Sequence, residues 1–222
     1  MPQKEYFSVI YDGPILQSHE MDVRDLAPAL LAISDMLDEA NTIVYGDKSK
    51  VQVNVKGSFK TGSFGIEFSV IQQPLHDLIS ALNSDSVSAA CNLLGLLGFI
   101  GLPGSGLIGL LVLLRNRKIK KITKDNGKAT IYVDEENIVT EEKVIDLYAS
   151  VKIRTSLQKV ITEPLSKEGI ETFATEQGGK INSISTDQKD YFKTPDVQDE
   201  PLKDETRTTF LSSMRLLKIE NF

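Results

Sequence analysis

Residues 93–121 read LLGLLGFIGLPGSGLIGLLVLLRNRKIKK, and the interpretation of the whole chain depends on this stretch. Residues 93–114 carry no charged side chain, and residues 115–121 carry five positive charges. Three structures fit such a pattern: a membrane-spanning helix, an apolar hairpin that enters one leaflet, or the glycine loop and helix of a nucleotide-binding unit. A helix buried in a protein core, or in a seam between subunits, is the plainer alternative. Each structure predicts a different function.

The length of the uncharged stretch favours a transmembrane helix. No charged residue occurs from Ser86 to Leu114, and roughly 20 apolar residues suffice to cross a bilayer core. The positive cluster that follows places the C-terminal flank in the cytoplasm by the positive-inside rule. Anionic lipid headgroups are the expected partners of this cluster. The predicted headgroup-binding residues are Arg115, Arg117, Lys118, Lys120 and Lys121.

A turn near the middle of the stretch favours a hairpin instead. Pro103, Gly104, Ser105 and Gly106 form a strong turn sequence. The arms on either side have about 8 to 14 residues, or roughly 12 to 21 Å at 1.5 Å per residue, which is too short to span a bilayer. A hairpin leaves both soluble parts of the chain in the cytoplasm, whereas a single span would have to export the first part without a signal peptide.

The same turn also satisfies a dinucleotide-binding motif. Residues 104–109, GSGLIG, match G-x-G-x-x-G, and Asp134 ends a predicted strand 25 residues after Gly109. The alternative hypothesis is therefore a nucleotide-binding protein that uses Gly104, Gly106, Gly109 and Asp134, with the pyrophosphate at a helix N-terminus. The preceding Leu- and Gly-rich residues are poor strand formers, and the following helix has no polar face, which counts against it.

Small residues recur every four positions within the stretch. Gly101, Ser105 and Gly109 form a small-xxx-small pattern, which lets helices approach closely in lipid. The sequence therefore predicts that these three residues pack helices together in a homo-oligomer. The alternative is that the glycines form a hinge.

The composition excludes several functional classes. The net charge of −6 argues against a nucleic-acid binder. The single cysteine, Cys91, excludes a disulfide framework and a multi-cysteine zinc site, and neither His19 nor His76 lies at ligand spacing from it or from the other. We find no hydrolase, zinc-protease or P-loop motif and no signal peptide in the sequence. No catalytic residue, metal site or cofactor is predicted, and a non-enzymatic role is favoured.

The rest of the chain reads as alternating strands and helices. Helices are predicted at 25–45, 74–86 and 140–160, strands at 5–13, 128–133 and 181–188, an antiparallel hairpin at 50–71, and a strand or short helix at 169–177. The predicted class is α+β, with small mixed α/β units flanking the Gly-rich apolar segment. The expected parts are an α/β domain at 1–86, the membrane segment at 87–114, an α/β part with a long helix at 115–186, and a polar linker with a terminal strand at 187–222.

Two stretches resemble a family of uncharacterised bacterial proteins. They are YDGPILQSHEMDVRDLAPALLAISDMLDEAN at 11–41 and VQVNVKGSFKTGSFGIEF at 51–68, and the resemblance of pattern extends over residues 6–165. It implies an α/β start, a Gly-rich apolar middle and an α/β end, a bacterial or mobile-element origin, and a further β-rich region beyond the point equivalent to Phe222. The resemblance assigns no functional role to any residue of this chain.

These observations together predict a non-enzymatic, membrane-associated protein that anchors to or perturbs the bilayer. Its expected location is the bacterial inner membrane, with the soluble parts mainly in the cytoplasm. Membrane lipid, further copies of the chain and an unknown protein are the expected partners. A defence- or toxin-like effector that self-associates is an extension of this hypothesis.

Overall fold

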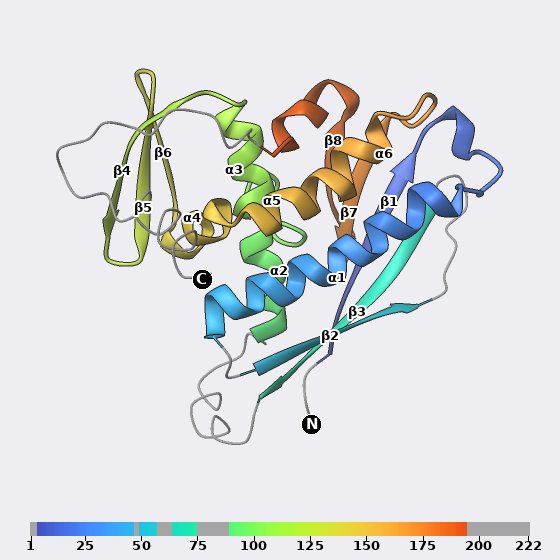
Figure 1. Cartoon of the computed structure of the whole chain (residues 1–222), viewed down its shortest axis with the longest axis horizontal. Helices are drawn as coiled ribbons and strands as arrows, with labels where there is room; N and C mark the ends of the chain where they lie inside the picture. The colour runs from blue at the N-terminus through green and yellow to red at the C-terminus, as the bar shows by residue number, and fades with distance from the viewer. Residues whose placement is uncertain (1–3, 47–48, 57–63, 75–88, 195–222) are drawn as a thin grey trace, which may run out of the picture.

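A five-stranded antiparallel sheet forms one half of the molecule (Figure 1). The computed structural model describes residues 4–46, 49–56, 64–74 and 89–194. The strand order is β2-β3-β1-β7-β8, so β1 lies in the centre between two hairpins from distant parts of the chain. The strands are β1 (Lys4–Asp12), β2 (Ser49–Lys56), β3 (Phe64–Pro74), β7 (Thr172–Gln177) and β8 (Lys180–Ser185).

Alternating apolar residues give this sheet its buried face. Phe7, Val9 and Tyr11 of β1 are almost fully buried, as alternation along a half-covered strand requires. Phe7 pairs with Phe68 of β3, and their rings stack with centroids 5.1 Å apart. The predicted strand at 5–13 and the predicted hairpin at 50–71 are confirmed, although residues 57–63 of the hairpin turn lie outside the described residues.

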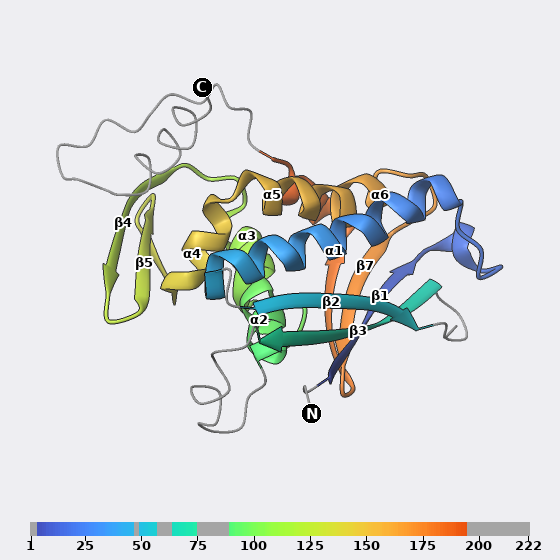
Figure 2. The same ribbon diagram turned by 60° about the horizontal axis from the view of Figure 1, so that its bottom comes forward.

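Helix α1 (Val23–Tyr45) covers the buried face of the sheet (Figure 2). It begins where the Asp22 carboxylate accepts a 2.8 Å hydrogen bond from the Arg24 amide, and it ends at Gly46, whose φ is +65°. The prediction of a helix over 25–45 is confirmed. Its buried stripe has helical spacing and consists of Ala29, Ala32, Ile33, Met36, Leu37 and Ala40.

The apolar segment forms a helical hairpin inside the protein. Helix α2 (Ala89–Leu97) and helix α3 (Gly106–Leu114) are nine residues long each and are joined by a turn over residues 98–105. Leu93, Leu94, Leu97 and Leu107 are completely buried. Among the described residues, none of the helices has both the length and the apolar character needed to cross a membrane. In the structure, residues 98–105 separate two short helices where the sequence had suggested one continuous helix.

A three-stranded antiparallel sheet packs on the other side of this hairpin. It has the order β4-β5-β6, with β4 (Ile119–Asp125), β5 (Lys128–Val133) and β6 (Glu136–Glu141). The sequence predicted only β5. Strand β4 coincides with the basic cluster, and lysines along an edge strand are a common device against unwanted pairing. Figure 1 shows α2 and α3 between the two sheets, which makes the hairpin the shared core of the molecule.

A bent helical run connects the two sheets along the chain. It consists of α4 (Glu142–Ala149), α5 (Val151–Leu157), the π-helical turn η3 (Gln158–Thr162) and α6 (Glu163–Leu165). Ser150 ends α4 and caps α5 by accepting a hydrogen bond from the Ile153 amide, so the predicted helix at 140–160 is present but bent. Short 3-10 helices, η1 (Pro14–Leu16) and η4 (Thr186–Phe192), lie next to β1 and β8.

Tyr11 joins the central strand to the π-helical turn. Its hydroxyl donates a 2.8 Å hydrogen bond to the Val160 carbonyl in the core. Burial raises the pKa of the Tyr11 phenol above its ordinary value. The folded state therefore keeps this phenol neutral at a pH at which the unfolded chain ionises it.

We expect Tyr11→Phe to destabilise the protein by about 1 to 2 kcal/mol at neutral pH, because the Val160 carbonyl loses a buried donor. In the wild type, stability should fall above about pH 10 by as much as ~1.4 kcal/mol per pH unit from this group, because only the unfolded state releases the proton. Urea unfolding of both proteins at pH 7 and above pH 10 tests this. The difference between the free energies of unfolding of the two proteins should shrink as the pH rises. A difference that stays constant would contradict this role of Tyr11.

The α+β class is confirmed. Strands β7 and β8 belong to the predicted 115–186 part, yet they complete the sheet begun by the predicted 1–86 domain, so these two parts share one sheet. The predictions at 169–177 and 181–188 correspond to strands β7 and β8. Pro74, the first residue of the predicted helix at 74–86, ends strand β3, and residues 75–86 and the predicted terminal strand lie outside the described residues.

Candidate functional site

A groove of about 810 Å³ runs between the helical hairpin and the two sheets. One wall is formed by α2, α3 and the turn that joins them, the second by β6 and the start of α4, and the third by the turn between β7 and β8. Cys91, Asn92 and Gly95 line it from α2, and burial is the main cause that raises the pKa of the Cys91 thiol. The groove is thus lined by the hairpin, by the three-stranded sheet with α4, and by the β7–β8 end of the five-stranded sheet.

Strand β6 offers its edge to the groove. Four consecutive residues, 138–141, line it. Successive side chains on a strand point to opposite faces, so a cavity lined by four residues in a row touches the strand along its edge rather than on one face. β6 is also the last strand of its sheet, and within the described residues its outer edge pairs with no other strand. No described strand therefore pairs with the backbone N–H and C=O groups on this outer edge.

Exposed apolar side chains surround this edge. Val139 of β6 is 63% exposed and Leu113 of α3 is 47% exposed, and both line the groove. Leu102 and Ile181 are also exposed, and each directly follows a lining residue, Gly101 and Lys180 respectively. The floor between them is apolar and includes Leu96, Ile100, Leu110 and Val144. Apolar surface gathered at one place marks an interaction site more often than scattered apolar residues do.

Polar side chains fix the hairpin wall of the groove. The Tyr45 hydroxyl at the end of α1 donates to the Ala89 carbonyl at 3.2 Å and accepts a 3.0 Å hydrogen bond from the Asn92 side chain. Burial is the main cause that raises the pKa of the Tyr45 phenol. These contacts tie the start of α2 to α1, so this wall is held in place.

The glycines of the predicted dinucleotide loop hold the hairpin together. A Cβ on Gly106 would lie 2.5 Å from the Gly95 carbonyl oxygen and 2.5 Å from the Gly98 amide nitrogen. A Cβ on Gly109 would overlap the backbone of Gly104. The glycines thus allow close approach of backbones within the hairpin.

The topology around this loop differs from that of the dinucleotide-binding unit that the sequence motif suggested. The loop is preceded by helix α2 rather than by a strand, and the sheets are antiparallel. Gly104 and Gly106 do line the groove, but Asp134 lies in the turn between β5 and β6, where it is 3.7 Å from the Arg117 guanidinium. The residues assigned to a nucleotide therefore do not form one site.

The predicted helix-packing residues lie on different elements. Gly109 is inside α3, Ser105 is its N-cap and Gly101 lies in the turn before it. The Ser105 hydroxyl donates to the Leu102 carbonyl, and a Cβ on Gly101 would lie 3.2 Å from the Ser105 oxygen. The three residues thus do not form one helix face, and their small size serves contacts within the chain. Homo-oligomer formation stays a prediction.

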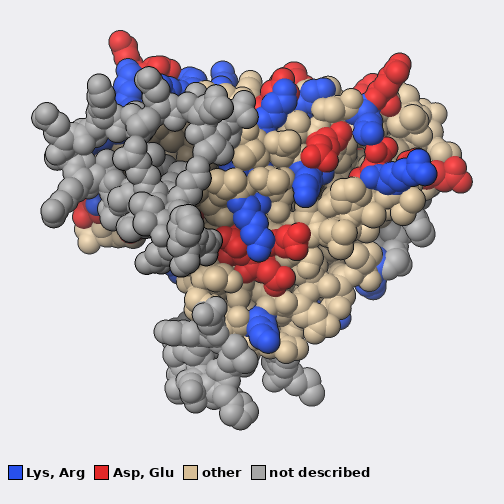
Figure 3. Space-filling view, in the orientation of Figure 1, with Lys and Arg blue, Asp and Glu red and all other residues tan. Residues whose placement is uncertain are grey.

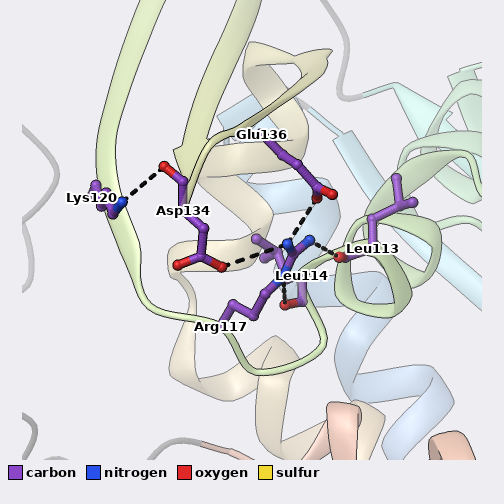
Figure 4. A network of polar contacts seen from close by, with 6 residues as sticks. All are labelled: Leu113, Leu114, Arg117, Lys120, Asp134 and Glu136. Atoms are coloured by element: carbon purple, nitrogen blue, oxygen red, sulfur yellow. Dashed lines mark hydrogen bonds and ion pairs between the residues drawn. The ribbon is translucent and has the colours of Figure 1, made fainter.

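Arg117, one of the predicted headgroup-binding residues, forms hydrogen bonds and ion pairs with residues of its own chain (Figure 4). Its guanidinium donates to the Leu113 carbonyl and pairs with the Glu136 carboxylate at 2.8 Å, and its Nε donates to the Leu114 carbonyl. It thereby satisfies the C-terminal carbonyls of α3 and ties them to the β5–β6 turn. The Lys120 ammonium donates to the Asp134 carbonyl at 2.8 Å. These two cations stabilise the fold.

The other three predicted headgroup-binding residues, Arg115, Lys118 and Lys121, are exposed. Arg115 ends α3 in a left-handed conformation, with φ of +51°. On the face shown in Figure 3, positive and negative side chains are interspersed, so this face carries no broad patch of one sign among the described residues. Binding to lipid headgroups stays a prediction.

The described residues were compared with the requirements of a metal site. No cluster of His, Cys, Asp and Glu among them could hold a metal ion. His19 lies in the loop before α1, and His76 lies outside the described residues. Comparison of the chain with protein-family models, curated proteins and solved structures gives no match. The resemblance stated from the sequence therefore stays a prediction.

The groove could not be predicted from the sequence, because its walls come from segments that are far apart in the chain. One local signal was available: Ile138, Val139 and Thr140 are β-branched, a composition typical of a strand. The distance between this strand and the hairpin could not be read from the sequence.

Proposed function

We propose that this protein is a non-enzymatic interaction module that binds an extended segment of a partner polypeptide in the groove along β6. The carrying observation is that the open edge of β6 and an apolar floor face the same groove. An added strand satisfies its backbone by pairing with such an edge, and its side chains occupy the apolar surroundings. The partner segment is therefore extended and has apolar side chains at alternate positions.

The packing of the hairpin supports the groove, rather than insertion of the hairpin into lipid, as the working state. Leu93, Leu94 and Leu107 are completely buried in the core that the hairpin shares with α1 and both sheets. In lipid these leucines would keep apolar surroundings, but the apolar residues of α1 and the sheets that pack against them would become exposed to water. Release of the hairpin would therefore disrupt the core. Membrane association and an inner-membrane location stay predictions from the sequence.

We expect Val139→Lys to weaken binding of a groove-directed peptide at least about tenfold, because the substitution places a charge where an apolar side chain would be buried. The probe is a displayed library of random twelve-residue peptides, selected on the full 222-residue chain. Affinities of the enriched peptides, synthesised and labelled, are measured by fluorescence polarisation. Stability should change by less than about 0.5 kcal/mol, since Val139 lies on the surface.

Val55→Lys is the matched control. Val55 is also an exposed valine on a terminal strand, 55% exposed on β2, but it belongs to the other sheet and does not line the groove. It should leave peptide affinity unchanged. If no peptide is enriched, or if both lysine variants bind the enriched peptides as well as the wild type does, the proposed function is wrong.

A further inference from the structure

We infer that the partner segment carries a carboxylate that lies against Lys180; this inference rests on the proposed function. The described lining of the groove contains two cations, Lys128 and Lys180, and one carboxylate, Glu141. The groove is therefore positive by one charge, whereas the chain as a whole has a net charge of −6. An acidic partner is complementary to the groove and is repelled by the rest of the surface, which favours this one place of binding.

The two lysines differ in their surroundings. Lys128 begins β5 and lies opposite Glu141 of β6 in the strand register, so a carboxylate already lies beside it. Lys180 begins β8, on the wall across the groove from β6. It is exposed and forms no ion pair with any described residue. Of the two lysines, Lys180 is thus the one that can form an ion pair with a carboxylate of a ligand.

The position of Lys180 also indicates which part of the partner it would contact. A strand added to β6 has one edge paired with β6 and its other edge facing the β7–β8 turn. Side chains of that strand point above and below the new sheet, and a long acidic side chain reaches a lysine across the groove. An Asp or Glu beside the apolar positions therefore adds specificity and fixes the register of the strand.

The test uses the peptides enriched on the full chain. We expect an Asp or Glu at one fixed position next to the apolar positions. Lys180→Glu should weaken binding of such a peptide by about threefold to tenfold, because a rim ion pair becomes a like-charge contact. Lys50→Glu, a charge reversal at an exposed position of β2 outside the groove, is the matched control and should change affinity less than about twofold.

A charge swap completes the experiment. The peptide in which the acidic residue is replaced by Lys should bind the Lys180→Glu protein more tightly than it binds the wild type. If enriched peptides depend on Val139 but lack an acidic residue, or are indifferent to Lys180→Glu, this inference is overturned while the proposed function stands. If no enriched peptide depends on Val139, the proposed function fails, and the inference fails with it.

Discussion

Replacing Gly106 by alanine is expected to lower the free energy of unfolding by about 2 to 5 kcal/mol. The φ of Gly106 is +66°, a left-handed conformation that costs an alanine roughly 1 to 2 kcal/mol. The added Cβ would also lie 2.5 Å from the Gly95 oxygen and 2.5 Å from the Gly98 nitrogen. Both atoms belong to the backbone and cannot rotate away, so the hairpin must open, at a further cost of about 1 to 3 kcal/mol.

Gly46→Ala separates the two contributions. Gly46 has nearly the same φ, +65°, but a Cβ there would meet no atom within 4 Å. Its ψ is −159°, a backbone conformation that essentially only glycine adopts, so this variant should cost only the conformational part, about 1 to 3 kcal/mol. Both variants are compared by urea unfolding monitored by circular dichroism. Equal losses at the two positions would mean that the helices of the hairpin do not pack as described.

The second large effect is expected for Leu107→Ala, which should destabilise the protein by about 2 to 5 kcal/mol. Leu107 lies on α3 and is completely buried. Its truncation removes apolar burial and leaves a cavity that the surrounding helices fill only in part. A loss of this size approaches half of a typical domain stability, so a large drop in melting temperature should accompany it.

Leu113→Ala is the control on the same helix. Leu113 is 47% exposed, and its truncation should change stability by less than about 0.5 kcal/mol. Calorimetry of the two variants gives the comparison. Similar small effects at both positions would show that α3 is not part of a protein core, which would return the membrane hypothesis to first place.

The sequence predicted the elements whose patterns are local. The apolar residues of α1 repeat with helical spacing and the valines of β2 alternate, so both elements could be placed within a few residues. The turn at Pro103 also predicted the two arms of the hairpin. Periodicity and turn residues suffice to place an element in the sequence when one face of it packs against the core and the other face is exposed to water.

The surroundings of the hairpin could not be predicted, because α3 is apolar on nearly every side. A helix of that kind suits lipid and a protein interior equally well, and only tertiary contacts separate them. The positive cluster was misleading for a related reason. Arg117 and Lys120 follow an apolar stretch, as lipid-facing cations do, yet they bind carbonyls and carboxylates of their own chain. Long-range partners of charged residues leave no local pattern.

The central position of β1 has a consequence for the order of events during synthesis. β1 pairs with β7, and the pair Tyr11 and Phe173 is separated by 162 positions along the chain. At about 5 to 20 residues per second, a ribosome needs roughly 8 to 32 seconds to add that length. Throughout this interval one side of β1 waits for a strand that does not yet exist. Until β7 is made, that edge of β1 has unpaired backbone N–H and C=O groups, which are a site for pairing with other chains.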